Sequence, residues 1–185
     1  MKFNPHLELI GKHAILSPSQ YHWINDDKEK LISRVNNLKA KELGTALHAY
    51  AADAIRFKRR QQDLDSLGMY VNDAIGYKMT PEQPLVYEKD ICFGTADAIS
   101  FYRKKLRIHD LKTGVTPAHM EQLQLYAALF CLEYQIKPRD IKIELRLYQS
   151  NDVIVDIPEA DKIQSFMDII VTDTDIVREV LESGE

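Results

Sequence analysis

The sequence has few cysteines and no long apolar segment. Among its 185 residues only Cys92 and Cys131 are cysteines, and neither belongs to a CxxC or a Cys/His spacing. This scarcity argues against a zinc site, an iron–sulfur cluster or a disulfide framework, and it indicates a reducing compartment. No apolar run is long enough to cross a bilayer, and the first residues lack the apolar centre of a signal peptide. We therefore expect a cytoplasmic protein that does not associate with membranes.

A strong net charge is also lacking. The formal net charge is −4, which does not by itself indicate a nucleic-acid-binding protein. The positive charges gather in two clusters, residues 58–60 and residues 103–105 with Arg107, whereas the chain from Asp152 onward is rich in acids. Taken alone, each basic cluster is typical of a solvated helix end or hairpin tip.

The hydrophobic content of 45% is that of an ordinary globular protein, and the length suits one sizeable core. We expect a single domain over residues 1–185. Helical spacing of leucine and alanine indicates a helix over residues 40–60, separated from an earlier helix by a break within the polar residues 33–41. Residues 61–80 are expected to be irregular, because Gly68 and Gly76 act as helix breakers.

Strand-like segments dominate the middle of the chain. Three of them cover residues 84–88, 91–101 and 105–112, with a hairpin tip between the second and the third. The elements expected after them are a helix over residues 118–134, a strand over 141–148, a short strand over 153–157, and two short helices broken near 172–175. The order helix, three strands, helix, strand predicts an α/β fold with a central mixed β-sheet flanked by helices.

The stretch Ile108-His-Asp-Leu-Lys-Thr-Gly114 has the most unusual chemistry in the sequence. Alternate residues of a strand share a face, so Asp110 and Lys112 follow Ile108 on an otherwise apolar side. Burying a carboxylate and an ammonium there is costly unless they are paired or bound. A structural ion pair at the strand end is one interpretation, and a catalytic or binding pair is the other.

Two further residues share this ambiguity. Asp97 is an acid inside the second strand, on the face of Ile99 and opposite to that of Ala96 and Ala98, and a hydrogen-bonded buried carboxylate would explain it. His48 lies beside an apolar helix stripe, where a satisfied core histidine is the ordinary explanation. The hairpin brings Asp97 next to the end of the third strand, however. Two carboxylates, a lysine and an imidazole that converge point to a divalent cation.

Four short motifs occur in order along the chain: Gly44-Thr-Ala-Leu-His48, Gly94-Thr-Ala-Asp97, Ile108-His-Asp-Leu-Lys-Thr-Gly114 and Gln122-Leu-Gln-Leu-Tyr126. Together they resemble the PD-(D/E)XK nuclease superfamily, and within it the RecB-like branch, which includes the nuclease domain of RecB, CRISPR-adaptation nucleases and many bacteriophage exonucleases. The stretch Leu16-Ser-Pro-Ser-Gln-Tyr-His-Trp23 also resembles the start of phage-encoded members. The resemblance covers residues 14–150 and implies a restriction-endonuclease-like core, to which residues 151–185 add a strand and helices.

The resemblance implies a metal site. His48 corresponds to the ligand on the helix and Asp97 to the central metal-bridging acid, while Asp110 binds the metal together with the carbonyl of Leu111. Asp110 stands where many relatives carry Glu, a variation that the family pattern allows. These ligand types suit Mg²⁺ or Mn²⁺, and the imidazole favours Mn²⁺. Members with an iron–sulfur cluster need four cysteines, so that subtype is excluded.

The resemblance also implies the activity. Asp97, Asp110 and Lys112 correspond to the catalytic residues, and Gln122 and Tyr126 to residues that position the nucleic-acid strand. We expect a divalent-metal-dependent deoxyribonuclease, an exonuclease of phage or bacterial DNA recombination or repair. Its partners would be single- or double-stranded DNA and, by analogy, further copies of itself or a recombination protein. The alternative is a catalytically silent nucleic-acid-binding or structural subunit with the same fold.

Overall fold

The computed structural model describes residues 4–12, 14–114 and 119–183. The chain divides into two compact units, residues 1–43 and residues 44–185. Helix α1 (Lys28–Arg56) contributes its first part to the smaller unit and its last part to the larger one. Within the described residues, no helix is both long enough and apolar enough to span a bilayer.

The smaller unit consists of short 3₁₀ helices and the start of α1. The 3₁₀ helices are η1 (Leu7–Leu9) and η2 (Pro18–Asn25). Asp27 caps α1, because its carboxylate accepts a hydrogen bond of 2.9 Å from the amide of Lys30. The predicted break within residues 33–41 is wrong, since α1 runs through them without interruption. That segment is polar but contains neither proline nor glycine, so nothing in it opposes the helix.

The larger unit is built on a mixed sheet of five strands in the order β1-β2-β3-β4-β5. All neighbouring strands are antiparallel except β3 and β4, which are parallel and are joined through helix α3 (Glu121–Glu133). The expected α/β class and the order helix, three strands, helix, strand are therefore confirmed. The strands are β1 (Thr80–Glu88), β2 (Cys92–Tyr102), β3 (Lys105–Leu111), β4 (Lys142–Gln149) and β5 (Asp152–Asp156).

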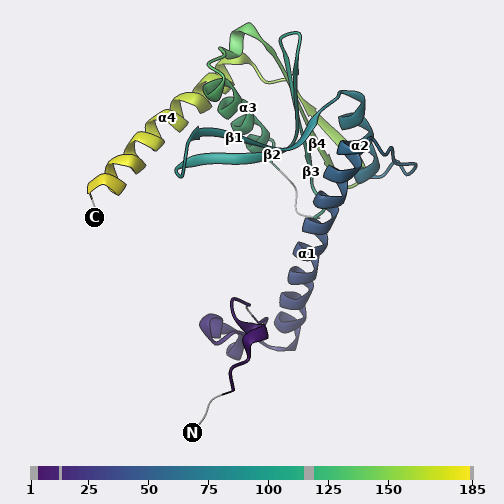
Figure 1. The fold of residues 1–185 in the computed structure, drawn as a ribbon, viewed down its shortest axis with the longest axis vertical. Coiled ribbons are helices and arrows are strands. Elements are labelled where there is room, and N and C mark those ends of the chain that lie inside the picture. The colour runs from purple at the N-terminus through teal and green to yellow at the C-terminus, as the bar shows by residue number, and fades with distance from the viewer. Residues whose placement is uncertain (1–3, 13, 115–118, 184–185) are drawn as a thin grey trace. The chain divides into compact units, whose positions relative to one another are not determined.

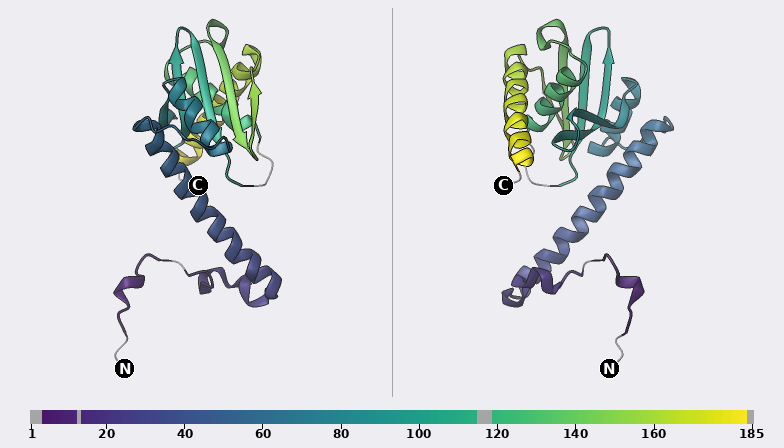
Figure 2. Two further views of the ribbon diagram at one scale, coloured as in Figure 1. Left: turned by 90° about the vertical axis from the view of Figure 1, so that its right-hand side faces the viewer. Right: turned by 60° about the vertical axis from the view of Figure 1, so that its left-hand side comes forward.

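Helices cover both faces of this sheet (Figures 1 and 2). On one face, α3 and α4 (Ala160–Ser183) pack with the strands around buried residues that include Leu106, Ile108 and Leu123. On the other face, the last turns of α1 and helix α2 (Ser66–Gly76) pack around Leu111 and Tyr148. The third strand thus contributes side chains to both cores.

Helix α2 is absent from the sequence prediction. Residues 66–76 are helical, capped by Asp65, whose carboxylate accepts a hydrogen bond of 2.8 Å from the amide of Gly68. Gly68 lies inside this helix and does not break it. A Cβ at that position would lie only 1.8 Å from the carbonyl oxygen of Asp63. The glycine is needed for this close approach of two backbone segments. Gly76 is the last residue of the helix.

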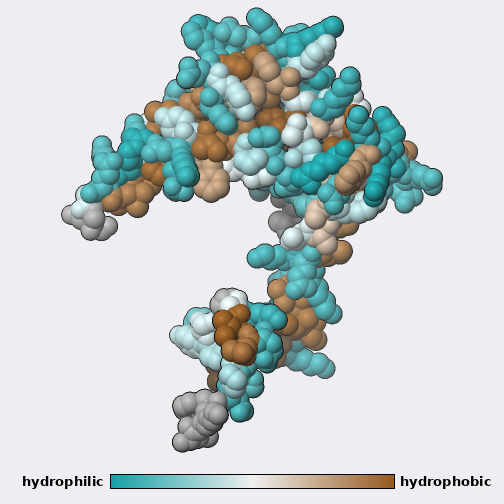
Figure 3. All heavy atoms as spheres, in the orientation of Figure 1, coloured by the Kyte–Doolittle hydropathy of each residue, from teal (hydrophilic) through white to brown (hydrophobic). Residues whose placement is uncertain are grey.

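The C-terminal region also differs from the prediction, since α4 is one continuous helix rather than two short ones. Thr172 satisfies its hydroxyl by donating a hydrogen bond of 2.9 Å to the carbonyl of Asp168, four residues earlier. Asp175 pairs with Arg178 on the same helix at 2.7 Å. These contacts remove the competition with the backbone that the sequence indicated. Apolar side chains remain exposed along α4 (Figure 3), among them Ile169, Ile176, Val180 and Leu181.

Two of the three hairpins of the sheet use two-residue turns. Arg103 and Lys104 both have positive φ, 49° and 60°, between β2 and β3. Ser150 and Asn151, with φ of 54° and 61°, turn the chain between β4 and β5. Two successive left-handed residues match the twist of an antiparallel pair. The expected hairpin tip between the second and the third strand is therefore confirmed. Of the helix expected over 118–134, Ala118 lies outside the described residues, as does Pro117 before it.

Candidate metal centre

Three side chains from three elements converge at one end of the sheet. His48 comes from α1, Glu82 from β1 and Asp97 from β2. One ligand atom of each lies within 4.8 Å of the others, a spacing that can hold a metal ion. His48 Nδ1 is 3.4 Å from Asp97 Oδ2. One imidazole nitrogen and two carboxylates form a mixed nitrogen and oxygen donor set, which suits a divalent cation.

The backbone explains why Glu82 joins this group. Its neighbours Pro81 and Gln83 pair with Ala98 and Ala96, the two neighbours of Asp97. Glu82 itself has a φ of 52°, a left-handed conformation that is rare within a strand. Strained residues of this kind cluster at functional sites. Glu82 and Asp97 therefore face each other at an irregular point of the β1–β2 pair.

The irregularity also changes the face of β2. Ala96 packs in the core beneath α3, whereas Ala98 packs in the core beneath α1 and α2. The prediction that these two alanines share one strand face is therefore wrong. The simple alternation breaks beside Asp97, where the strand passes from one core to the other. Such a break cannot be read from the alternation of residue types alone.

Helix α1 reaches the sheet closely just before His48. A Cβ at Gly44 would lie 2.9 Å from the hydroxyl of Thr113, beyond the end of β3. Gly44 precedes His48 by four residues and so lies on the same face of the helix. The absent side chain allows this face, and with it the imidazole, to approach the strand end.

Asp97 is fixed by a backbone group of the neighbouring strand. The amide of Leu111 donates a hydrogen bond of 3.0 Å to Asp97 Oδ2, the same oxygen that faces His48. This contact confirms the expectation that Asp97 lies beside the end of the third strand. The contact between Leu111 and this site is the hydrogen bond that its backbone amide donates. A role for its carbonyl as a ligand stays a prediction.

Asp110 lies beside this group but does not belong to the triad within 4.8 Å. Its carboxylate is buried, with 2% of the residue exposed, and Lys112 Nζ is 3.0 Å from Oδ2 and 3.2 Å from Oδ1. Only the contact to Oδ1 has hydrogen-bond geometry, so Oδ2 accepts no hydrogen bond from any described residue. A buried carboxylate oxygen in this condition is unusual and has the capacity to accept one further donor or a cation.

Lys112 connects the strand end to α3. Besides its ion pair with Asp110, its ammonium donates a hydrogen bond of 2.7 Å to Gln122 Oε1. Gln122 is exposed in the first turn of the helix. The structure therefore brings three of the predicted residues into one chain of contacts, and Gln122 holds the lysine that the sequence analysis assigned to catalysis.

Tyr126 packs one turn further along α3. A Cβ at Gly94 would lie 2.9 Å from Tyr126 Cε1, so the glycine of the second motif makes room for the tyrosine of the fourth. Tyr126 is half-buried and packs against the core on the α3 side. It therefore has a packing role that the sequence analysis did not assign, in addition to any contact with substrate.

The acids of the centre influence one another. Burial, and then the charge of Asp97, raise the pKa of both Asp110 and Glu82 above their ordinary values, although Lys112 opposes this for Asp110 and His48 for Glu82. The hydrogen-bonded carboxylate of Asp97 raises the pKa of His48, although burial opposes it. Negative charge is thus crowded at this end of the sheet, and a bound cation would relieve it.

Glu82 is the site residue that the sequence analysis missed. The first strand was expected to cover residues 84–88, so Glu82 lay outside it. In the structure β1 begins at Thr80 and includes both Pro81 and Pro84, which an edge strand tolerates. A first strand extended to Thr80 would have placed Glu82 opposite Asp97, and this pair of acids would have indicated Glu82 as a site residue.

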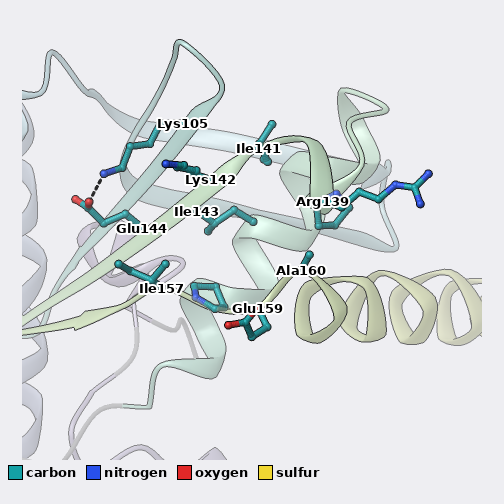
Figure 4. Close-up of a pocket in the computed structure, with 11 residues that line it drawn as sticks. Lys105, Arg139, Ile141, Lys142, Ile143, Glu144, Ile157, Glu159 and Ala160 are labelled. Atoms are coloured by element: carbon teal, nitrogen blue, oxygen red, sulfur yellow. Dashed lines mark hydrogen bonds and ion pairs between the residues drawn. The ribbon is translucent and has the colours of Figure 1, made fainter.

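The predicted basic clusters contribute no side chain to the triad of the metal centre. Lys105, at the start of β3, forms an ion pair with Glu144 of β4 (Figure 4), so its charge is partly neutralised. Arg107 also approaches Glu144, at 3.4 Å. Arg103 and Lys104 form the exposed hairpin tip, and Lys58 follows the end of α1. Phosphate contacts at these clusters stay predictions.

No family model, no curated protein and no solved structure gives a significant match to this chain.

Proposed function

We propose that the protein is a divalent-metal-dependent nuclease that hydrolyses phosphodiester bonds of DNA. The observation that carries this proposal is the convergence of His48, Glu82 and Asp97 within 4.8 Å of one another, beside the buried pair Asp110 and Lys112. Carboxylates, an imidazole and a lysine at one strand end are the groups that metal-assisted phosphodiester hydrolysis uses.

The residues present fit a bound cation. Carboxylate oxygens suit Mg²⁺ and Mn²⁺, and one imidazole is compatible with Mn²⁺. Oδ2 of Asp110, which accepts no hydrogen bond from a described residue, and the raised pKa values of Asp110 and Glu82 are what a site with unbalanced negative charge would show. His48, Glu82 and Asp97 would hold the ion, with Asp110 as a further ligand or as an acid that faces it.

The side chains of the site then have separate roles in hydrolysis. When bound, the metal supplies a water of lowered pKa and neutralises charge on the phosphate. Asp97 is held in place by the amide of Leu111 and keeps its position without the ion. Lys112, anchored on Gln122, offers an ammonium to a phosphate oxygen next to Asp110. Gln122 acts through Lys112 and is therefore a positioning residue.

The family assignment is part of the same proposal. The four sequence motifs meet in space, since their residues His48, Asp97, Asp110 with Lys112, and Gln122 form linked contacts around one strand end. This supports a place in the RecB-like branch of the PD-(D/E)XK superfamily and, with it, exonuclease activity on DNA. The α/β topology agrees with that branch but is shared by proteins of many functions.

A cleavage assay tests the proposal. End-labelled linear DNA and circular DNA of the same sequence are incubated with the protein and Mn²⁺, Mg²⁺ or EDTA. We expect metal-dependent loss of the linear substrate, with the circular DNA resistant if the enzyme needs an end. Asp97→Asn should abolish cleavage, while Asp90→Asn, an exposed acid in the β1–β2 turn, should retain it. Failure of the wild-type protein to cut either DNA with either metal would refute the proposal.

A further inference from the structure

A pocket lies on the same two strands as the metal centre. It has a volume of about 520 Å³ and is lined by the C-terminal end of α2, the first residue of β1 and the last residues of β2, with Arg107 of β3. Its residues are Gly76, Tyr77, Lys78, Thr80, Ser100, Phe101, Tyr102 and Arg107. This volume is within the range of sites that hold small organic molecules, from about 300 to 1,000 Å³. We call it the Tyr77 pocket.

The Tyr77 pocket forms where the sheet is incomplete. The pairing of β1 with β2 begins at Thr80 and Ile99, whereas β2 continues to Tyr102. The amides of Lys78 and Met79 turn back to carbonyls of α2, at 3.1 and 2.9 Å, and so do not extend β1. The last residues of β2 are therefore paired with β3 on one side only, and the gap on the other side becomes the pocket.

The lining combines aromatic rings with cations. Tyr102 is 63% exposed, so its ring presents area to a ligand. The ring of Phe101 instead packs against Phe130 of α3, with 5.2 Å between the ring centres. The guanidinium of Arg107 lies 4.4 Å from the ring centre of Tyr77, and its Nε lies 3.4 Å from Glu144 Oε1; the two contacts fix its position. Lys78 is exposed and forms no ion pair with a described residue. In addition, Ser100 Oγ is buried without a hydrogen-bond partner among the described residues.

This combination matches one class of ligand. A planar apolar ring beside an anionic group is the structure of a nucleotide, and proteins bind single strands by stacking bases on aromatic side chains next to cationic grooves. Base stacking on Tyr102 requires a base that is free of its partner and of its neighbours in the stack. The pocket therefore fits an unpaired nucleotide better than a duplex.

The position relative to the metal centre is also consistent. Thr80 is two residues from Glu82 on β1, and Ser100 is three residues from Asp97 on β2. At about 3.3 Å per strand residue, these separations are about 7 and 10 Å. We propose that the Tyr77 pocket holds one nucleotide of a single strand whose neighbouring phosphate occupies the metal centre. Tyr102 stacks on the base, and Lys78 and Arg107 contact the phosphate of the nucleotide in the pocket. This inference rests on the proposed nuclease function and names the form of its substrate.

A binding experiment without catalysis tests the inference. Fluorescence anisotropy in EDTA measures the Kd of a labelled oligodeoxynucleotide, once as a single strand and once in a duplex. The variant Tyr102→Ala/Lys78→Gln removes an exposed ring and an exposed charge. We expect the Kd for the single strand to rise about tenfold. The Kd for the duplex should change by less than about twofold.

A matched control uses the same substitutions elsewhere. Tyr134→Ala/Lys89→Gln removes a tyrosine of similar exposure (51%) and an exposed lysine, both outside the pocket. This control should bind like the wild type, and both variants should keep the wild-type melting temperature. An unchanged Kd for the single strand in the pocket variant, or an equal loss for single strand and duplex, would overturn the inference.

Two further readouts locate the ligand. An oligonucleotide with 5-iodouracil should cross-link to the peptide that contains Phe101 and Tyr102, and cross-links found only in other peptides would refute the assignment. Deoxyadenosine monophosphate is the second probe. If it binds the wild type but not the pocket variant while oligonucleotide binding is unaffected, the ligand is a free nucleotide and the inference fails. Because all binding is measured in EDTA, a wild type that binds single strands through the pocket but never cleaves would refute only the nuclease proposal.

Discussion

Lys112 Nζ donates a hydrogen bond of 2.7 Å to Gln122 Oε1, which ties the end of β3 to the first turn of α3. The same ammonium is 3.0 Å from Asp110 Oδ2. The lysine is thus held between a neutral amide on the surface and a buried carboxylate. A catalytic lysine needs such fixed placement, but so does a structural ion pair, and the two roles predict different outcomes for one substitution.

The first prediction concerns Lys112→Ala. If the ammonium acts on the phosphate, cleavage should fall by orders of magnitude while Mn²⁺ still binds, because removal of a positive charge makes cation binding easier. If the lysine is only an ion-pair partner, Asp110 is left buried and unpaired, and the protein should lose about 3–5 kcal/mol of stability. Melting temperature, Mn²⁺ binding and cleavage are measured on one sample. A folded, metal-binding and fully active variant would contradict the catalytic role.

The second prediction tests Glu82 as a metal ligand. Glu82→Gln should weaken the rise in melting temperature that Mn²⁺ produces, because Glu82 lies within the triad. Without metal the variant should be as stable as the wild type or more stable, since one of the crowded carboxylates is gone. Glu179→Gln, an exposed acid on α4, serves as the control. An undiminished response of the Glu82 variant to Mn²⁺ would exclude Glu82 as a ligand.

The predictable part of the site is the part that strand geometry dictates. Asp97, Asp110 and Lys112 lie on neighbouring strands of a hairpin, and residue types with a period of two were enough to bring them together. His48 followed from helical spacing and the motif. Glu82 could not be found in this way, because its contribution depends on a left-handed φ and on an edge strand that tolerates two prolines.

The fold shows the same division. The sheet and α3 follow from apolar alternation and spacing, and both were expected. The continuity of α4 depends on a threonine hydroxyl bonded to a carbonyl and on the pair of Asp175 with Arg178, contacts that exist only after the helix has formed. Helix α2 requires the close approach of Gly68 to Asp63. Helix propensities of single residues do not predict either kind of contact.

The third prediction concerns Gly94 and Tyr126. Gly94→Ala places a methyl group 2.9 Å from the present position of Tyr126 Cε1, so the ring must move. We expect cleavage to weaken while the melting temperature falls only modestly, because the ring is half-buried and can tilt.

Tyr126→Phe completes the third test. It keeps the ring against Gly94 and removes only the hydroxyl, so stability should remain nearly unchanged while cleavage weakens if the hydroxyl contacts the strand. A large loss of melting temperature together with normal cleavage in either variant would show that Tyr126 is purely structural.

The fourth prediction concerns pH and a histidine outside the metal centre. His109 is 0% exposed and lies on the α2 side of β3. The hydroxyl of Tyr148 donates to Asp73 at 2.7 Å, so it accepts from His109 Nδ1 at 3.1 Å, and the proton of the neutral ring is on Nδ1. His109 Nε2 then has no partner among the described residues.

Burial, followed by the positive charge of Arg146, lowers the pKa of His109 to about 3. The ordinary value is 6.5, so between these two pH values the unfolded chain binds a proton that the folded chain does not. The free energy of unfolding should therefore decrease as pH falls through this window, by up to about 1.4 kcal/mol per pH unit from this residue. The titratable and charged groups around the ring are Tyr77, Tyr148, Asp73, Arg107, Arg146 and Glu144.

His109→Gln removes the titrating ring and keeps an amide that can donate to Tyr148. Its unfolding free energy, measured by urea titration from pH 7 to pH 4, should be lower than that of the wild type at pH 7 but should depend less steeply on pH. His119→Gln replaces an exposed histidine and should retain the wild-type slope. Equal slopes for His109→Gln and the wild type would mean that the acid sensitivity of the fold arises from other groups, and that the buried ring accepts a proton as readily in the folded state as in the unfolded one.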